Sequence, residues 1–177
     1  LSTIAIRFPS HKVTRAILKK INFPLAMPSA NLSSRLSPVT AEDVADEFKK
    51  NIKLIINGGR SRIGIESTVI DLSKKPKILR PGVIGANLIK KILKIKIKIV
   101  KKGLKLESPG MMGRHYSPGI PVLLNQKISG KNGALITFGN NYINKKSYFN
   151  LSKNSNLKEA ASNLYKTLRK IKKLGYL

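Results

Sequence analysis

The fold of this chain is organised around one polar stretch, Pro28-Ser29-Ala30-Asn31-Leu32-Ser33-Ser34-Arg35-Leu36-Ser37-Pro38-Val39-Thr40. It follows a short apolar run, 24–27, that predicts a strand, and it places four serines, an asparagine and an arginine in a loop before a helix start. Small donors and acceptors between a strand end and a helix N-terminus suit an anionic or zwitterionic ligand. The alternative interpretation is a serine-rich turn that only caps the next helix.

The composition is that of a globular protein. The 177 residues are 41% hydrophobic, which is enough for one large domain, or for one domain and part of a second. The absence of cysteine excludes disulfides and thiolate zinc sites, and it agrees with a cytoplasmic location. Because no apolar run approaches the roughly 18 residues that span a bilayer, we expect no membrane partner.

The net charge of +27, from 35 Lys and Arg against 8 Asp and Glu, is the most unusual feature of the composition. Such a charge attracts polyanions, so a weak contact with RNA or tRNA is one expectation. However, the lysines are spread along the chain with abundant Ile and Asn, a combination that an AT-rich genome also produces. Aromatic residues make up only 6% and are not interleaved with the basic ones, so no platform for stacking bases is evident.

The hydrophobic pattern of the first hundred residues predicts an α/β fold class. Strands are expected at 3–8, 24–27, 53–57, 69–72, 77–80 and 92–100, the last an edge strand with lysines outward. Helices are expected at 11–21, 40–50 and 85–93, the first capped by Ser10. His11 falls in the first turn of its helix, and we interpret it as a surface or capping residue.

Half of the acidic residues lie in the predicted helix at 40–50, at Glu42, Asp43, Asp46 and Glu47. Thr40 and Asp43 have the spacing of a capping box. Clustered carboxylates could hold a metal or act as an acid–base pair. Because acids in the first turns of a helix complement its dipole, we expect these four to face water.

A segment dense in proline and glycine, 103–121, predicts a linker after a first domain at 1–102. Unlike a passive tether it carries chemically capable side chains, namely Met111, Met112, Arg114, His115 and Tyr116. Beyond it, strands expected at 121–125 and 134–138 and a helix at 157–174 open a second α/β unit at 122–177. Since the chain begins inside a predicted strand and ends just after that helix, we expect truncation at both ends.

Three of the predicted strands end in polar loops, at 29–31, 66–68 and 80–82. If these strands are neighbours in one sheet, the loops converge on one site. That site would offer hydroxyls, an amide, a carboxylate and guanidinium groups, but no cysteine, histidine cluster or repeated acids for a metal. Such groups bind phosphates and amino acids, and they catalyse by positioning and charge neutralisation.

Five motifs occur in a fixed order along the chain. They are Thr3-Ile4-Ala5-Ile6-Arg7-Phe8-Pro9, Pro28-Ser29-Ala30-Asn31 with Ser33 and Ser37-Pro38, Gly64-Ile65-Glu66-Ser67-Thr68-Val69-Ile70-Asp71, Leu79-Arg80-Pro81-Gly82, and Ser108-Pro109-Gly110-Met111 with Arg114-His115-Tyr116-Ser117-Pro118. In this order they resemble the threonylcarbamoyl-AMP synthases, over nearly the whole chain. The last motif is that of the two-domain form, which has a YrdC-like domain, a linker and a smaller C-terminal domain.

The resemblance implies an enzyme, a nucleotidyltransferase that condenses L-threonine, bicarbonate and ATP to threonylcarbamoyl-AMP and pyrophosphate for the threonylcarbamoyladenosine modification of tRNA. It implies a YrdC-like domain with a twisted mixed sheet around a concave cavity, followed by a partial Rossmann-like α/β domain. ATP would be a substrate, and Mg²⁺ would be carried by the nucleotide. We assign no catalytic acid, base or nucleophile, and no protein metal ligand.

Carried over motif by motif, the resemblance implies two sets of contacts. The contacts to L-threonine are Arg7, Ser29 and Ser67, with Arg7 as the partner of the carboxylate. The contacts to ATP are Thr3, Asn31, Ser37, Val39, Arg80 and Tyr116, with Val39 limited to backbone or apolar contact.

The sequence departs from the family pattern at its start, where the family's N-terminal Lys-x-Arg segment is absent. We therefore expect half a site, and an isolated chain that makes no threonylcarbamoyl adenylate. Arg35 and Arg60 are interpreted as surface or loop residues, although either could approach a phosphate. Two alternatives stay open: an RNA-binding module that uses the same concave surface, and an inert product of a degraded gene.

Overall fold

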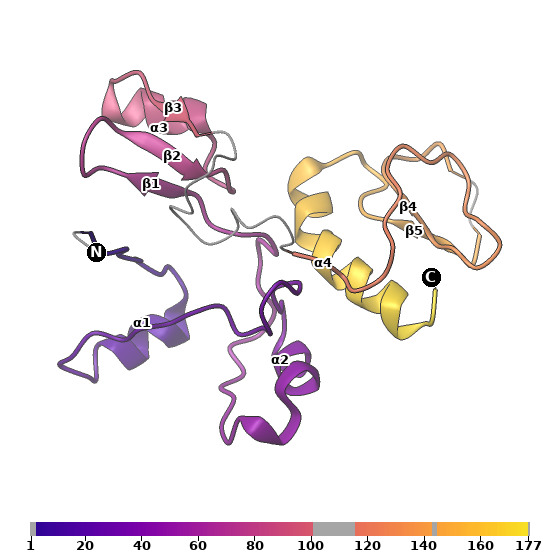
Figure 1. Ribbon diagram of the computed structural model, residues 1–177, viewed down its shortest axis with the longest axis horizontal. Coiled ribbons are helices and arrows are strands. Elements are labelled where there is room, and N and C mark those ends of the chain that lie inside the picture. The colour runs from indigo at the N-terminus through magenta and orange to yellow at the C-terminus, as the bar shows by residue number, and fades with distance from the viewer. Residues whose placement is uncertain (1–2, 101–115, 143–144, 177) are drawn as a thin grey trace.

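The computed structural model describes residues 3–100, 116–142 and 145–176 (Figure 1). Its elements, in chain order, are α1 (Lys12–Leu18), α2 (Ala41–Phe48), the 3₁₀ helix η1 (Lys49–Asn51), β1 (Val69–Asp71), β2 (Lys77–Arg80), α3 (Ala86–Leu93), β3 (Lys98–Ile99), β4 (Leu135–Thr137), β5 (Tyr148–Asn150) and α4 (Leu157–Lys173). The predicted α/β class is confirmed. None of the described helices combines the length and apolar character needed to cross a bilayer.

The first sheet has the order β1-β2-β3 and is mixed. β1 is antiparallel to β2, whereas β3 returns parallel to β2 after the α3 crossover. Ile78 of β2, Ile89 of α3 and Ile97 form one buried cluster, because the amphipathic helix places its apolar face on the sheet. The register of β1 shifts between Val69 and Ile70, directly beside the polar loop at 66–68.

The second sheet is a parallel pair, β4 and β5, followed by the long helix α4. Asn156 caps α4, since its side chain accepts hydrogen bonds from the backbone N–H groups of Lys158 and Glu159. Figure 1 shows three lobes: β1–β3 with α3, α1 with α2, and β4–β5 with α4. The helix α4 lies between its own sheet and the other two lobes, so one face of α4 is turned toward those lobes.

Several predicted strands are not strands in this structure. The segments at 3–8, 24–27, 53–57 and 121–125 form no ladder, and the strand at 92–100 is reduced to β3. In the first segment Ile4, Ile6 and Phe8 are 86–88% exposed. A strand exists only where a neighbour takes up its backbone hydrogen bonds, and the described residues place none beside these segments. The strand β5 was not predicted.

The helices agree better with their predictions. α1 is shorter than the expected 11–21 and is capped by His11 rather than Ser10, because the His11 ring accepts from the Thr14 N–H. The capping role proposed for His11 is thereby confirmed. None of the residues of α1 is buried. α2, α3 and α4 begin and end close to the predicted positions. Helix ends are encoded by neighbouring residues, and strand pairing is not.

Candidate functional site

The loop at 28–40 ends in a capping box that fixes its last residues. Thr40 Oγ1 accepts from the Asp43 N–H at 3.2 Å, and the Asp43 carboxylate accepts from the Thr40 N–H at 3.2 Å and the Val39 N–H at 2.9 Å. Val39 is buried, together with Leu36. The turn between these two residues, which contains Ser37, is therefore held at its C-terminal end by α2.

Glu47 of α2 also holds this loop, and the expectation that it faces water is wrong. Its side chain is 5% exposed, accepts from the Leu32 N–H at 3.2 Å and pairs with Arg35 at 3.6 Å and Arg169 at 3.3 Å. Glu47 lies one turn beyond Asp43 on the same face of the helix, so it meets the same loop. Arg35 remains largely exposed, as expected for a loop residue.

The second polar loop, at 66–68, is held by Arg80 at the end of β2. Its guanidinium donates to the Ser67 carbonyl at 3.0 Å, to Ser67 Oγ at 3.1 Å and to the Tyr116 hydroxyl at 3.3 Å, and it pairs with Glu66 at 3.7 Å. Three partners in different directions fix a planar guanidinium in one orientation. The Arg80 charge therefore has a defined place in the site.

Glu66 joins the two loops, because its carboxylate accepts a hydrogen bond from the Ser37 hydroxyl as well as pairing with Arg80. Glu66 is not among the predicted site residues. The signal that could have found it is that it is the single carboxylate in the three strand-end loops at 29–31, 66–68 and 80–82.

Close backbone contact joins the loops at 66–68 and 80–82. A Cβ atom at Gly82 would lie 2.3 Å from the Thr68 nitrogen and 2.6 Å from the Glu66 carbonyl oxygen. Only glycine allows this approach without moving the backbone. The motif Leu79-Arg80-Pro81-Gly82 thus has a steric reason for its last residue.

A cavity of about 400 Å³ lies where these loops meet. Its lining includes all three predicted threonine contacts, and these three side chains are exposed to it: Arg7, Ser29 and Ser67. Ser37, Glu66 and the apolar Val39 also line the cavity. The loops at 28–40 and 66–68 therefore meet at the cavity, and the loop at 80–82 joins them through its contacts with 66–68. The common sheet expected for these loops is not present, because 24–27 is not a strand. The ligand roles of the residues remain predictions.

The other predicted ATP contacts lie around this cavity or apart from it. Arg80 contacts Ser67, Glu66 and the Tyr116 hydroxyl, and neither Arg80 nor Tyr116 is in the described lining of the cavity. The linker residue Ser117 donates its N–H to the Ser34 carbonyl at 2.9 Å. Asn31 turns its amide nitrogen onto its own loop, and its buried Oδ1 has no hydrogen-bond partner among the described residues.

Thr3 is exposed and does not line the cavity among the described residues. Met111, Met112, Arg114 and His115 lie outside the described residues. A wider hollow of about 900 Å³ runs between α1, α2 and the segment at 55–63, but Val39 is the single predicted site residue in its described lining. More of the predicted site residues therefore lie at the smaller cavity than at the wider hollow.

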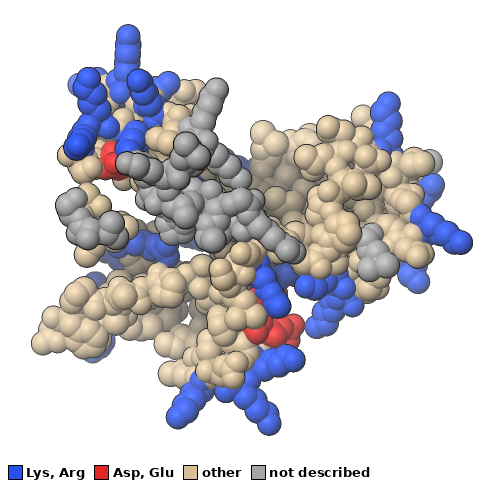
Figure 2. Space-filling view, viewed as in Figure 1, with Lys and Arg blue, Asp and Glu red and all other residues tan. Residues whose placement is uncertain are grey.

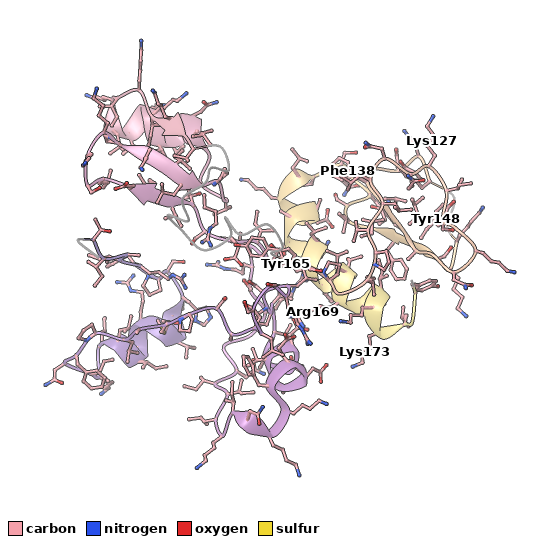
Figure 3. The ribbon with its side chains drawn as sticks, viewed as in Figure 1. Lys127, Phe138, Tyr148, Tyr165, Arg169 and Lys173 are labelled. Carbon is pink, nitrogen blue, oxygen red and sulfur yellow. The ribbon has the colours of Figure 1, made fainter. Side chains whose placement is uncertain are left out.

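The far side of the site is formed by α4. Tyr165, which also lines the cavity, stacks on Tyr116 with ring centroids 6.2 Å apart and an interplanar angle of 26°. Burial, followed by the nearby Glu66 charge, raises the pKa of Tyr165 to about 12, and the same two causes raise the pKa of Tyr116. In Figure 3, Tyr165 and Arg169 lie on the side of α4 toward the loops, whereas Lys127 and Tyr148 lie in the far lobe.

Comparison with known proteins agrees with this geometry. Residues 1–82 match a family model described as "Telomere recombination", and residues 84–176 match one described as "Threonylcarbamoyl-AMP synthase, C-terminal domain". The chain belongs to the threonylcarbamoyl-AMP synthase family. The predicted family and its two-domain layout are confirmed, whereas the predicted boundaries at 102 and 121 remain predictions.

Relatives in three organisms are named threonylcarbamoyl-AMP synthase. The Pyrococcus abyssi protein is 34% identical over 99% of this chain and 57% of its own length. The Bacillus subtilis protein is 41% identical over 70% of this chain and 37% of its own length. The Schizosaccharomyces pombe protein is 39% identical over 69% of this chain and 32% of its own length. The chain thus spans between about a third and somewhat over half of the length of these family members.

Two solved structures are similar to this family member over 99% of the chain. The crystal structure of P. abyssi Sua5 complexed with L-threonine has a TM-score of 0.80 at 30% identity and is covered over 57% of its length. A variant of that protein, with a neighbouring histidine and tyrosine replaced by alanine, has a TM-score of 0.77 at 28% identity and 56% coverage. The α/β fold with a mixed sheet is therefore that of the family.

Proposed function

We propose that this chain carries about half of the site of an L-threonylcarbamoyl-AMP synthase. The proposed reaction condenses L-threonine, bicarbonate and ATP to threonylcarbamoyl-AMP and pyrophosphate, for modification of tRNA in the cytoplasm. The observation that carries the proposal is the cavity that unites Arg7, Ser29 and Ser67 with the turn at 37–39. The likeness to a structure complexed with L-threonine supports it.

The threonine side of the proposed site is formed by one guanidinium and two hydroxyls. Arg7 would bind the α-carboxylate with two parallel N–H groups, as arginine does with carboxylates. Ser29 and Ser67 would meet the ammonium or hydroxyl group from the opposite loops. All three side chains are exposed to the cavity, so a ligand can replace water on them.

The nucleotide side consists of the turn at 37–39 together with Asn31, Arg80 and Tyr116, and Thr3 is retained as a more distant contact. The carbamate oxygen of threonine attacks the α-phosphorus of ATP, a new P–O bond forms, and the bond to the bridging oxygen breaks to release pyrophosphate. The held guanidinium of Arg80 neutralises the charge that develops on the phosphate oxygens.

Mg²⁺ would enter on the nucleotide rather than on the protein. The part of the chain that the structure describes has no group of three or more His, Cys, Asp or Glu residues placed to hold a metal. Glu66, the one carboxylate among the described residues that line the cavity, is already engaged by Ser37 and Arg80. A nucleotide-borne ion would lower the charge of the phosphates, and the chain's own residues would orient them.

The finer fold assignments are part of the same proposal. The parallel pair β4 and β5 followed by α4 supports a Rossmann-like second unit. The cavity between the loops supports a concave site in the YrdC-like unit.

An RNA-binding module is the second candidate, favoured by the net charge of +27. Figure 2 shows the Lys and Arg side chains at the margins of all three lobes on the visible face, with no single patch. Such a distribution suits weak, sequence-independent contact with a polyanion better than a defined RNA site.

Calorimetric titration of the chain with Mg-ATP tests the proposal. Saturable binding is expected, with affinity reduced at least about tenfold by Arg80→Ala and less by Tyr116→Phe, because a lost charge contact to phosphate costs more than a lost hydroxyl. Lys127→Ala, in the far lobe, is the matched control. Absent ATP binding, with RNA affinity that falls steeply with salt, would favour the second candidate.

Turnover is tested separately. The chain alone is expected to release no pyrophosphate. A fusion that supplies the part of the Pyrococcus abyssi relative not covered by this chain is expected to make threonylcarbamoyl-AMP, detected by mass spectrometry. Full activity of the chain alone would contradict the predicted half site.

A further inference from the structure

We propose that α4 of the C-terminal unit is a wall of the substrate site, and that Tyr165 and Arg169 are positioning residues that set the turn at 36–39 for the nucleotide. This inference rests on the proposed function. Tyr165 and Arg169 are four residues apart, so they lie on one face of α4. The structure turns that face toward the two polar loops (Figure 3).

Arg169 of α4 holds the N-terminal end of the turn and also contacts α2. Its guanidinium donates to the Leu36 carbonyl at 2.5 Å and to the Glu47 carboxylate at 3.3 Å. Asp43 holds the Val39 N–H at the other end of the turn. Ser37 and Pro38 lie between these two points, so Ser37 is presented to the cavity with little freedom to move.

Tyr165 links the same helix to the Arg80 side of the site. Tyr165 is 8% exposed and packs in one buried cluster with Leu36 and Val39. It also stacks on Tyr116, whose hydroxyl accepts a hydrogen bond from Arg80. The helix α4 thus contacts the turn at 36–39 and the Arg80–Tyr116 pair, two groups of predicted ATP contacts from segments distant in sequence.

Docking of α4 has a second anchor that does not involve the turn. Arg60, predicted to be a surface or loop residue, donates to the Ser162 carbonyl at 2.7 Å and to Asn163 at 3.0 Å. Gly64, with a φ of 72°, lies so close that a Cβ atom would be 2.6 Å from the Ser162 carbonyl oxygen. These contacts can keep α4 in place when Arg169 is changed, so positioning can be separated from docking.

The chain also contains a matched control for the Arg169–Glu47 pair. Lys173 and Asp46 form a second ion pair between α4 and α2, at 3.7 Å, with side chains 82% and 69% exposed. The Arg169 and Glu47 side chains are 19% and 5% exposed. Because an exposed pair contributes little and a buried one is costly to break, the two pairs separate a surface charge effect from positioning.

The test measures Mg-ATP and L-threonine binding to the chain by calorimetry for Arg169→Lys, Tyr165→Leu and Lys173→Ala, with thermal unfolding followed by circular dichroism. Lysine keeps the charge of Arg169 but cannot bridge two acceptors with a planar fork. We expect Arg169→Lys and Tyr165→Leu to weaken ATP binding about tenfold while threonine affinity changes less than about twofold. Lys173→Ala should match the wild type in both.

Equal losses of both ligands in Arg169→Lys and Tyr165→Leu, or ATP affinities equal to that of Lys173→Ala, would overturn the inference while leaving the proposed function intact. A wild-type chain that binds neither ligand would instead overturn the proposed function and this inference with it. If Tyr165→Leu fails to fold, Tyr165→Phe with Arg169→Lys decides. The phenylalanine retains the stack and should bind ATP as the wild type does, and a tenfold loss there would contradict positioning through the ring.

Discussion

The loop at 28–40 and the segment at 3–8 both flank the candidate cavity, but they are held very differently. The loop is tied by Asp43 and Glu47 of α2 and by Arg169 of α4. The segment at 3–8 forms no ladder, and its apolar side chains face solvent, although Arg7 reaches the cavity. The difference shows that the loop at 28–40 is pre-organised by side chains of this chain, whereas Arg7 is carried by a segment with few described contacts.

Removal of the Glu47 carboxylate should have the largest effect on the held loop. Glu47→Ala leaves Arg169 and the Leu32 N–H without their buried partner, so we expect a loss of about 3 kcal/mol in the free energy of unfolding, measured in urea. Asp46→Ala, one residue earlier and exposed, is the control and should change it by less than about 0.5 kcal/mol. Similar losses for both variants would contradict the assignment of Glu47 as the tie.

Alkaline pH should weaken the packing of α4 against the loop. Because the pKa of Tyr165 is about 12 in the folded chain against 10 for an ordinary tyrosine, the folded state keeps its proton after the unfolded state has lost it. The stabilisation of the folded state by protonated Tyr165 is therefore complete below pH 10. It is lost as pH rises from about 10 through 12, which lowers the free energy of unfolding by on the order of 2 kcal/mol in total. Urea unfolding between pH 8 and about 11.5 should therefore show a steeper decline for the wild type than for Tyr165→Phe; parallel curves would count against this packing.

Loss of the capping box should loosen the loop by a smaller amount. Thr40→Ala removes the acceptor for the Asp43 N–H, and we expect a loss of about 1 kcal/mol. Thr40→Ser keeps the hydroxyl and should recover most of it. Circular dichroism at 222 nm during urea unfolding measures both variants, and equal stability of the two would show that the cap is not what holds α2.

The smallest effect should come from the loosely held segment. Ile6 is 88% exposed, so Ile6→Ser should change the free energy of unfolding by less than about 0.5 kcal/mol. A loss above 1 kcal/mol, by the same urea measurement, would mean that 3–8 is as well held as the loop, and the contrast between the two regions would fail.

The parts of the molecule that could be predicted are those encoded by near neighbours in sequence. The cap at Thr40, the helices α2 to α4 and the strands β1 and β2 follow from local patterns. Motif positions predicted part of the cavity lining: of the nine predicted contacts, the five that line it are Arg7, Ser29, Ser37, Val39 and Ser67. The predicted strands at 3–8 and 53–57 failed because a strand needs a partner that a local pattern does not supply.

The contacts from α4 could not be predicted for a related reason. Arg169 meets Glu47 and Leu36 across 122 and 133 residues of chain. Nothing in the local pattern of Tyr165 or Arg169 distinguishes them from other residues of an amphipathic helix. Glu47 was misassigned to solvent for the same reason, because its partners lie on other elements.

The hydrogen bond between Arg169 and the Leu36 carbonyl also has a consequence for biosynthesis. Because the two residues are 133 positions apart, the turn at 36–39 leaves the ribosome long before the helix that secures it. At about 5–20 residues per second, this interval lasts on the order of ten seconds. The turn at 36–39 is therefore secured by this contact only after α4 has been synthesised, and a nascent chain that stops before α4 lacks the contact.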